Sequence, residues 1–388
     1  MAYPIPLISE SDGARFLSDL YVRTETACPD PDGRPPALLV SMPTAWTNKY
    51  QLLLYKRAAR HRFAVAGVTV PDALEYVSWP GPVVLHAHWF AASFAGVHSE
   101  TAAMARLEQV IDMVERFKSQ NDAKLLWTAH NVFPHGNRFP ETFLALRQWI
   151  FRTFDAVHLM NDGHLALLED TFGVPPRATF TVPHMLYTGA MPGGVDRLAA
   201  RAQFGFPHDA RVFGYFGSIQ GYKGLGRLVE SLLDLADRSD RPIRGLIGGI
   251  PSDTAVVREL QQQLGTRQDI RFLPRQIRDH EVPVLHAASD MMVLPYENTL
   301  NSGAALMAAT FGIPFLMPRG SASAGLESLG ARTYDPDDPG ALAAALADTS
   351  VSAPPADPEA WRLREPDTVS DAFFRAVSDL LDDEPGGP

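Results

Sequence analysis

The sequence predicts an α/β protein with two doubly wound domains in tandem, each a parallel sheet covered by helices. Short apolar runs alternate with longer amphipathic stretches along almost the whole chain of 388 residues. Runs that are apolar throughout are typical of strands buried on both faces by helices. The alternation stops near Pro183–Asp209 and then restarts, and at roughly 150 residues per domain the length suits two units. Two such Rossmann-like domains would face a central cleft, with ligands beyond the carboxyl ends of the strands.

The first predicted domain covers residues 1–185. Its expected strands are Ala37–Ser41, Val83–His88, Lys124–Thr128, Ala156–Met160 and Thr179–Val182. The expected helices between them begin near Asn48, cross Glu100–Lys118 and Glu141–Thr153, and end at Phe172. Glycines and prolines in the stretch that follows, such as Met191-Pro192-Gly193-Gly194, indicate a linker.

The second predicted domain covers residues 195–355. Its expected strands are Arg211–Phe216, Ile243–Ile247, Arg271–Leu273, Met291–Leu294, Ile313–Met317 and Thr333–Tyr334. A linker rich in proline, serine and alanine follows from Asp348 to Pro358, and a last amphipathic helix covers about Asp367–Leu381. We expect the segment 359–388 to pack back on the first domain.

Composition excludes some classes of protein. Lys and Arg number 34 against 45 Asp and Glu, a formal net charge of −11, which argues against a protein that coats nucleic acid. Cys28 is the only cysteine, so no intrachain disulfide is possible. We see neither a secretory leader after Met1 nor an apolar window of about 18 residues, and we expect a cytoplasmic protein.

The segment Tyr215–Gly224 opens the second domain directly after its first strand. Glycines at the end of a strand let the backbone approach a ligand, and the next helix offers free amides and a positive dipole end. Lys223 adds a point charge, so the segment suits a diphosphate. The glycine spacing matches neither a Walker loop nor a dinucleotide fingerprint. The alternative is a solvated lysine at the start of a helix.

The segment Leu294–Met307 follows a later strand of the same domain. Asn301 or Ser302 can cap the helix that begins here. Small residues from Ser302 to Ala304 would let a phosphate reach the backbone amides. The alternative is a capped helix whose small residues only pack against the sheet.

These two segments carry a resemblance. The strings YFGSIQGYKG and ASDMMVLPYENTLNSGAALMAATFGIPFL resemble the nucleotide-binding half of two-domain glycosyltransferases of the GT-B fold. The family 4-like bacterial sugar transferases are the most similar branch. In the first half HAHWF, LLWTAHNVFPH, AVHLMNDGHLALLEDTFGV and VPHMLY follow the same order.

The resemblance implies a metal-independent transfer from a UDP- or GDP-linked sugar, with no cofactor. Fixed positive charge and helix amides would stabilise the leaving diphosphate, and preorganised donors of this kind are often the largest catalytic contribution. Lys223 takes the position of the diphosphate-binding lysine, and Ser302 and Gly303 that of the amides near the distal phosphate. The loop Pro274–Ile277 falls where the family reads the nucleobase. The implied donor-binding residues are Gly217, Ser218, Gln220, Lys223, Arg275, Ile277, Tyr296, Glu297, Asn301, Ser302, Gly303 and Ala304.

The sequence departs from the family pattern at two places. Ser218 or Gln220 stands where the family has a second cation, so Arg275 or another residue must substitute or affinity must drop. The family's pair of glutamates is absent, and Thr299 and Met307 occupy its two positions. Glu297 and Asn298 lie nearby and could contact the donor. These departures leave open whether configuration is retained, which the resemblance slightly favours, and whether the homologue is inactive.

Histidines mark the first domain. His130 lies at the carboxyl end of a strand. The resemblance implies that it sits beside the donor sugar and the acceptor, as the matching family histidine does. The pKa range of an imidazole suits proton transfer to or from a sugar hydroxyl there. A histidine that only shapes the loop is the alternative. His86 and His88 share one strand face, which fits a packed pair better than a metal pair, since no acidic cluster accompanies them. The expected acceptor-side residues are His88, Asn131, His135 and Lys49.

The stretch from Gly33 to Pro71 contains no acidic residue. It holds the basic residues Arg34, Lys49, Lys56, Arg57, Arg60 and Arg62, with Tyr50, Leu52, Leu53, Leu54 and Tyr55 among them. A basic amphipathic helix can rest on an anionic membrane surface or recognise an acidic acceptor. The alternative is a helix that faces the core and has a solvated basic side.

The leading hypothesis is therefore a glycosyltransferase that acts on a nucleotide-diphosphate sugar. The acceptor is a lipid-linked glycan at the inner membrane face or a diffusible small molecule. If the enzyme inverts configuration, His130 or a nearby carboxylate is the candidate base. The alternatives are a sugar-nucleotide epimerase or phosphorylase on the same scaffold and a non-catalytic sugar-nucleotide-binding homologue.

Overall fold

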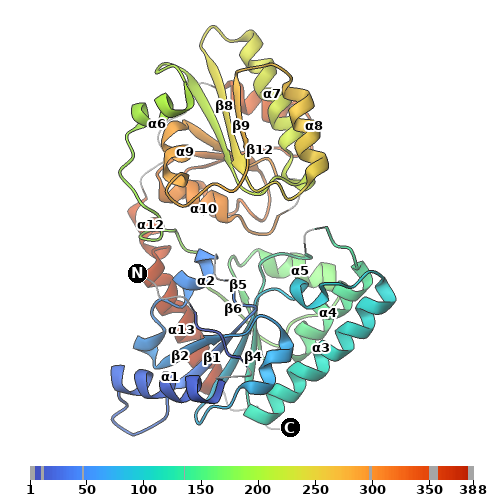
Figure 1. The fold of residues 1–388 in the computed structure, drawn as a ribbon, viewed down its shortest axis with the longest axis vertical. Helices are drawn as coiled ribbons and strands as arrows, with labels where there is room; N and C mark the ends of the chain where they lie inside the picture. Colours follow the sequence, from blue (N-terminus) through green and yellow to red (C-terminus); the bar gives the residue numbers. More distant parts are fainter. Residues whose placement is uncertain are drawn as a thin grey trace. The chain divides into compact units, whose positions relative to one another are not determined.

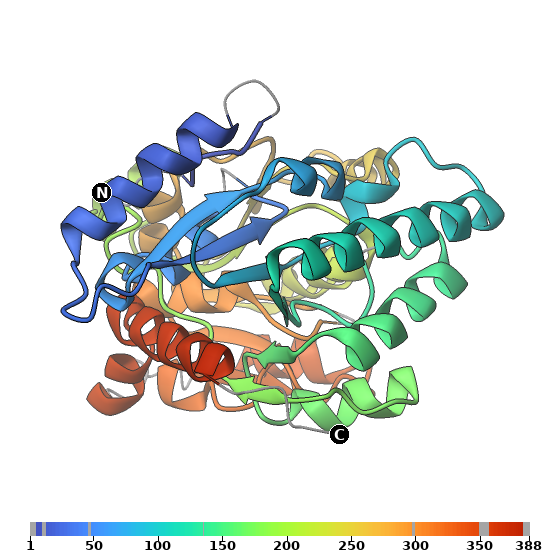
Figure 2. The same cartoon turned by 90° about the horizontal axis from the view of Figure 1, so that it is seen from below.

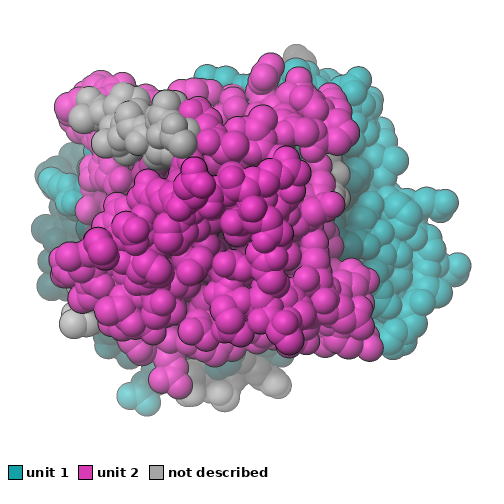
Figure 3. Space-filling view, turned by 90° about the horizontal axis from the view of Figure 1, so that it is seen from above, with its two compact units in different colours: residues 1–185, 366–388 teal, residues 186–365 magenta. Residues whose placement is uncertain are grey.

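The computed structural model describes residues 5–9, 13–45, 48–134, 136–296, 299–348 and 357–382. Its contacts divide the chain into two compact units (Figures 1 and 3). Unit 1 consists of Met1–Met185 and Pro366–Pro388, and unit 2 of Leu186–Glu365. Each unit contains one six-stranded parallel sheet, which confirms the predicted fold class of two doubly wound α/β units.

The sheet of unit 1 has the strand order β2-β1-β3-β4-β5-β6. Its strands are β1 (Ala37–Met42), β2 (Phe63–Gly67), β3 (Val83–Ala87), β4 (Lys124–Thr128), β5 (Ala156–Leu159) and β6 (Thr179–Thr181). Five of them were expected from their apolar runs. β2 was missed, because Phe63-Ala64-Val65-Ala66-Gly67 is short, rich in small residues and preceded by a run of basic residues.

The helices of unit 1 occupy the stretches between these strands. They are α1 (Gly13–Ala27), α2 (Lys49–Leu54), η1 (Ala58–His61), η2 (Pro71–Tyr76), η3 (Ala91–Phe94), α3 (Glu100–Asn121), α4 (Pro140–Thr153), α5 (His164–Phe172) and α13 (Pro366–Asp382). Ser99 caps the start of helix α3, and its hydroxyl accepts a hydrogen bond from the Ala102 amide at 3.2 Å. Asp122 caps the other end in the left-handed conformation.

The last helix, α13, packs against α2 and η1 of unit 1 (red in Figures 1 and 2). Phe373 and Phe374 are fully buried, and the Ser370 hydroxyl donates a hydrogen bond to the Leu54 carbonyl at 2.6 Å. Residues 359–365 of the segment that we expected to join the first domain belong instead to unit 2.

The sheet of unit 2 has the strand order β12-β11-β10-β7-β8-β9. Its strands are β7 (Arg211–Phe216), β8 (Ile243–Gly249), β9 (Ile270–Pro274), β10 (Met291–Val293), β11 (Phe315–Pro318) and β12 (Ala331–Tyr334). Its helices are α6 (Arg197–Phe204), η4 (Gly221–Lys223), α7 (Leu225–Arg238), α8 (Thr254–Leu264), α9 (Val282–Ala288), α10 (Gly303–Thr310), η5 (Glu327–Leu329), α11 (Ala341–Ala347) and α12 (Pro358–Leu363).

Helix α6 corrects the expectation of a plain linker over Pro183–Asp209. Asp196 caps its start by accepting a hydrogen bond from the Ala199 amide at 2.8 Å. Gly205 ends it in the left-handed conformation at φ 69°. The turn signals noted in the sequence therefore flank a short helix.

Each sheet has a point at which the strand order reverses. In unit 2 this point lies between β7 and β10, and in unit 1 between β1 and β3. Ligands of doubly wound sheets bind beyond the carboxyl ends of the strands at such a point. Among the described residues, no helix combines the length and apolar character that a membrane span requires.

Candidate functional site

A cavity of about 230 Å³ lies where β7 and β10 end in unit 2. It is lined by Tyr187, Phe216, Gly217, Lys223, Tyr296, Asn301, Ser302, Gly303, Ala304 and Met307. The two segments singled out in the sequence thus meet, because β7 and β10 are neighbours in the sheet. Seven of the expected donor-binding residues line this pocket: Gly217, Lys223, Tyr296, Asn301, Ser302, Gly303 and Ala304.

Lys223 supplies a positive charge to this pocket. Its ammonium nitrogen lies 3.7 Å from the centre of the Tyr296 ring and 4.7 Å from that of Tyr222. Burial lowers the pKa of Lys223 to about 8. Lys223 forms no ion pair with a carboxylate of the described residues. A half-buried ammonium that is held over an aromatic face and lacks a counter-ion among the described residues is suited to pair with an anionic ligand.

Helix α10 presents its N-terminus to the same pocket. The Ser302 hydroxyl caps the helix by accepting a hydrogen bond from the Ala305 amide at 3.2 Å. Gly303 and Ala304 follow with small side chains, which leave the backbone amides of the first turn accessible to a ligand. These amides and the helix dipole favour a phosphate group. Burial raises the pKa of Tyr296, which also hydrogen-bonds Ser302.

Two glycines bring the pocket loops together. Gly224 has φ +64°, and a Cβ there would lie 2.1 Å from the Pro295 carbonyl oxygen. A Cβ on Gly249 would lie 1.6 Å from the carbonyl oxygen of Gly217. Larger residues at these two positions would push the β7 loop away from its neighbours.

Some expected donor-binding residues do not line the pocket. Gln220 donates a hydrogen bond to the Ser218 hydroxyl at 3.2 Å, outside the set of lining residues. Arg275, the expected replacement cation, forms a bidentate pair with Glu281 at 2.6 and 2.9 Å. Ile277 is buried beside Gly248. Glu297 and Asn298 lie outside the described residues, as does His135 of unit 1.

Two aromatic residues of the lining were missed in the sequence. Phe216 ends β7. Tyr187 is the second residue of unit 2, and its backbone amide donates to the Thr310 hydroxyl at 2.8 Å. Tyr187 is the last residue of the VPHMLY string, and that position was the available signal. Met307, which stands in place of a family glutamate, also lines the cavity.

In unit 1, a buried hydrogen-bond chain lies where β3 and β4 end. His130 Nε2 lies 2.9 Å from His88 Nδ1, and His88 Nε2 lies 2.6 Å from the Tyr55 hydroxyl. The same hydroxyl lies 2.8 Å from His86 Nδ1. His86 and His88 therefore face the same side of β3, as their spacing predicted, with ring centres 4.2 Å apart.

The chain continues across the sheet. His86 Nε2 lies 2.6 Å from the Thr128 hydroxyl, which lies 2.9 Å from His158 Nδ1. His158 Nε2 ends the chain at the Val182 carbonyl oxygen, 2.9 Å away. Sheet register explains the geometry, because Thr128 and His158 are direct partners on β4 and β5.

Burial keeps these four histidines neutral near pH 7. It lowers the pKa of His88 to about 3 and that of His158 to about 4. The pKa values of His86 and His130 also lie well below the usual range, with burial as the largest cause and neighbouring histidines adding to it. Neutral imidazoles each have one donor and one acceptor nitrogen, as a continuous hydrogen-bond chain requires.

Aromatic rings surround His130. The Trp89 ring stacks on it with centres 4.2 Å apart, and Tyr50 meets it edge-on at 5.1 Å. Lys49 is the first residue of α2, directly before Tyr50, and Asn131 directly follows His130. His88, which was expected on the acceptor side, is buried and forms part of the hydrogen-bond chain.

The basic stretch of unit 1 faces acidic residues of the same unit. Lys56 pairs with Asp367 at 2.8 Å, and Arg57 and His61 pair with Asp371 at 3.2 and 2.9 Å. Both aspartates belong to α13. Tyr50, Leu53, Leu54 and Tyr55 are buried in the core. This arrangement agrees with the alternative of a helix that faces the core, since several of its cations are already paired.

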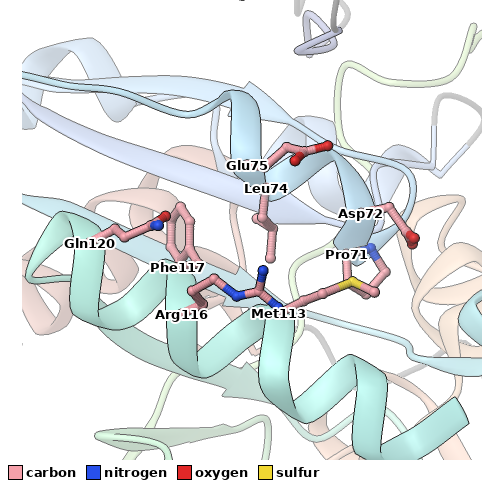
Figure 4. Close-up of a pocket in the computed structure, with 8 residues that line it drawn as sticks. All are labelled: Pro71, Asp72, Leu74, Glu75, Met113, Arg116, Phe117 and Gln120. Atoms are coloured by element: carbon pink, nitrogen blue, oxygen red, sulfur yellow. The ribbon is translucent and has the colours of Figure 1, made fainter.

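A second cavity, of about 180 Å³, lies in unit 1 between η2 and α3 (Figure 4). Figure 4 shows the residues that line it: Pro71, Asp72, Leu74, Glu75, Met113, Arg116, Phe117 and Gln120. None of the expected site residues is among them. In the part of the chain that the structure describes, no group of three or more His, Cys, Asp or Glu side chains could hold a metal ion.

The chain is similar to several known proteins. Residues 196–320 match the family described as glycosyl transferases group 1. A D-inositol 3-phosphate glycosyltransferase of Corynebacterium urealyticum is 30% identical over 229 residues, which are 56% of this chain and 54% of the relative. The chain thus spans about half the length of this curated relative.

Solved structures match over most of the chain. Anabaena HepE in complex with UDP and glucose aligns with a TM-score of 0.66 and 16% identity, covering 89% of this chain and 100% of that chain. Sucrose-phosphate synthase of Thermosynechococcus elongatus aligns with a TM-score of 0.61 and 15% identity, covering 89% and 95%. The chain therefore has the GT-B fold, and residues 196–320 of its second unit are similar to group 1 glycosyl transferases, in agreement with the sequence resemblance.

Proposed function

We propose that this protein transfers a sugar from a nucleotide-diphosphate sugar to a hydroxyl group of an acceptor. The observation that carries the proposal is the pocket between β7 and β10, where Lys223 and the N-terminus of α10 converge. A positive charge and free amides at one point suit a diphosphate whose negative charge grows as the sugar leaves. The names of the relatives, which are glycosyltransferases, support the same reaction.

The donor that we propose is a UDP-linked sugar, with a GDP-linked sugar as the alternative. HepE, which shares the fold, was crystallised with UDP and glucose. The phosphates would lie against Lys223, Gly303 and Ala304. Tyr187 and Phe216 would contribute apolar contact surface on the same cavity wall. We propose that no metal takes part, since Lys223 and the helix amides provide the positive potential.

The acceptor that we propose is a small phosphorylated polyol or sugar. The relatives include an enzyme named for D-inositol 3-phosphate and one named sucrose-phosphate synthase. A lipid-linked acceptor at an anionic membrane has less support, because Lys56 and Arg57 of the basic stretch already pair with α13. If configuration is retained, the leaving phosphate itself would take the acceptor proton.

The test is turnover of a panel of UDP- and GDP-sugars with sugar phosphates, inositol phosphates and non-phosphorylated polyols as acceptors. We expect nucleoside diphosphate release that depends on the acceptor and is unchanged by a chelator. The anomeric configuration of the product, read by NMR, decides between retention and inversion. Donor binding without transfer to any acceptor would instead favour a non-catalytic sugar-nucleotide-binding homologue. Conversion of the donor itself without an acceptor would favour an epimerase.

A further inference from the structure

The hydrogen-bond chain of unit 1 has a direction, which its last member sets. The Val182 carbonyl oxygen can only accept a hydrogen bond, so His158 must carry its proton on Nε2. Because a neutral imidazole has a single N–H, His158 Nδ1 is then an acceptor. The Thr128 hydroxyl, 2.9 Å away, must donate to it.

The same reasoning passes back along the chain. The Thr128 hydroxyl has used its proton, so it accepts from His86, which carries its proton on Nε2. His86 Nδ1 is thus an acceptor for the Tyr55 hydroxyl proton. The Tyr55 oxygen also lies 3.3 Å from the Ser41 hydroxyl oxygen, but its single proton goes to His86 Nδ1, which is nearer at 2.8 Å.

The last two contacts assign the donor and acceptor atoms of His88 and His130. The Tyr55 oxygen, having donated to His86, accepts from His88 Nε2. His88 Nδ1 then accepts from His130 Nε2. Six hydrogen bonds therefore point the same way, from His130 to the Val182 carbonyl. The opposite direction would require that carbonyl oxygen to donate.

We propose that this chain fixes the tautomer of His130, with the proton on Nε2 and the lone pair on Nδ1. Tyr55, Thr128 and His158 are then positioning residues that act through His130. For the reaction, and resting on the proposed function, His130 serves as a hydrogen-bond acceptor through Nδ1 toward a sugar hydroxyl. The ionisable groups that act on His130 from the surrounding elements are His88, His158, His184 and Arg147, beside the Tyr50 ring.

Removal of the Thr128 hydroxyl should reverse the tautomer of His130, which lies four hydrogen bonds away. In Thr128→Val, His86 Nε2–H loses its acceptor and moves its proton to Nδ1, where it donates to Tyr55. The Tyr55 hydroxyl then donates its proton to His88 Nε2 in place of His86 Nδ1. His88 carries its proton on Nδ1 and donates to His130 Nε2, so His130 becomes the Nδ1–H form. His158 stays unchanged on the Val182 carbonyl.

The experiment is ¹⁵N NMR of the histidine rings in the labelled full chain at neutral pH, with signals assigned by single His→Asn variants. We expect the Nε2–H form at all four histidines in the wild type. The Thr128→Val variant should reverse His86, His88 and His130 together. Thr128→Ser, which keeps the hydroxyl, should retain the wild-type pattern. An unchanged His130 in Thr128→Val, or a reversal in Thr128→Ser, would overturn the proposal.

A second variant covers the case in which Thr128→Val does not fold. Tyr55→Phe removes the acceptor of His88 but leaves the bond between His86 and Thr128. We expect reversal at His88 and His130 only, with His86 unchanged. Reversal at His86, or none at His130, would contradict the proposed order of the chain.

Turnover separates this inference from the proposed function. If His130 accepts a substrate hydrogen bond through Nδ1, Thr128→Val should lower kcat about tenfold, the effect of losing one hydrogen bond. The KM for the nucleotide sugar should stay the same, and Thr128→Ser should keep its kcat. A wild type that transfers no sugar would overturn the proposed function, while the NMR pattern would still decide the tautomer.

Discussion

The two units solve different electrostatic problems near the carboxyl ends of their strands. In unit 2, small residues, helix amides and Lys223 line an accessible cavity. In unit 1, four histidines and two hydroxyl groups satisfy one another, and all of them are buried except His130, which is half-buried. The first arrangement leaves positive potential for a ligand, whereas the second consumes its hydrogen bonds internally and fixes orientation. The difference suggests that binding strength resides in unit 2 and geometric precision in unit 1.

The largest expected difference between the units is their response to acid. An unfolded histidine has a pKa near 6.5, while burial holds those of His88 and His158 at about 3 and 4. Below pH 6.5 the unfolded chain binds protons that the folded unit cannot. Stability is therefore lost as the pH falls from 6.5 toward 4, by about 1.4 kcal/mol per pH unit for each histidine.

Urea unfolding followed by tryptophan fluorescence measures this effect. Five of the six tryptophans belong to unit 1, all but Trp361. Unit 2 contains His286, whose pKa burial also lowers to about 4, so unit 2 should lose stability less steeply. A unit 1 that is equally stable at pH 5 and at pH 7 would show that the histidines titrate normally.

The next largest effect should follow from loss of the charge in unit 2. Lys223→Met keeps an unbranched chain against Tyr296 but removes the ammonium group. We expect donor affinity to fall roughly 10- to 100-fold, since hydrogen bonds to charged groups contribute about 1.5–3 kcal/mol. Calorimetric titration with UDP measures it. Arg275→Met is the matched control, because that guanidinium pairs with Glu281 and does not line the pocket; equal losses in both variants would contradict the site.

A pH titration sharpens the same comparison. The protonated form of Lys223 binds the diphosphate, and its pKa in the free protein is about 8. Affinity should therefore be full below pH 8 and decrease as the pH rises above it, by up to about tenfold per pH unit. Lys223→Arg should abolish this dependence, because a guanidinium stays charged. A wild-type affinity that is constant from one unit below to one unit above pH 8 would contradict this assignment.

The smallest expected effect concerns the cap of α10. Ser302→Ala removes the hydroxyl that accepts from the Ala305 amide. We expect a loss of about 1 kcal/mol in the free energy of unfolding. Ser302→Asn should restore much of it, because asparagine caps helices as well as serine does. Thermal unfolding of the three proteins checks the order, and an alanine variant as stable as the wild type would exclude the cap as a stabilising contact.

The strands and the pocket of unit 2 could largely be predicted from local patterns. Buried strands are continuous apolar runs, and β4 and β7 have the bounds that their runs indicated. The loops after β7 and β10 meet because doubly wound sheets bring such strands together at the reversal of strand order. The pairing of Arg275 could not be predicted in this way, because its carboxylate partner Glu281 lies on a loop whose path no periodicity specifies.

The hydrogen-bond chain of unit 1 could be predicted only in part from local sequence patterns. Spacing along β3 indicated that His86 and His88 share a face, and His130 followed from its place at a strand end. Thr128 and His158 joined them only through the register of β4 with β5. A sequence pattern does not contain that register, because it depends on which strands become neighbours. The missed strand β2 has a different cause, because its run Phe63–Gly67 is short and rich in small residues.

The placement of α13 has a consequence for the order of events during synthesis. Unit 1 is interrupted in the sequence by the whole of unit 2 and is completed by α13. Until that helix leaves the ribosome, the surface of His86 that stacks on Phe373 stays open. Domains generally fold as units in the order in which they emerge. Here the middle of the chain can mature before its beginning, and the nascent first half must wait with apolar surface exposed, a period in which chaperones would bind it.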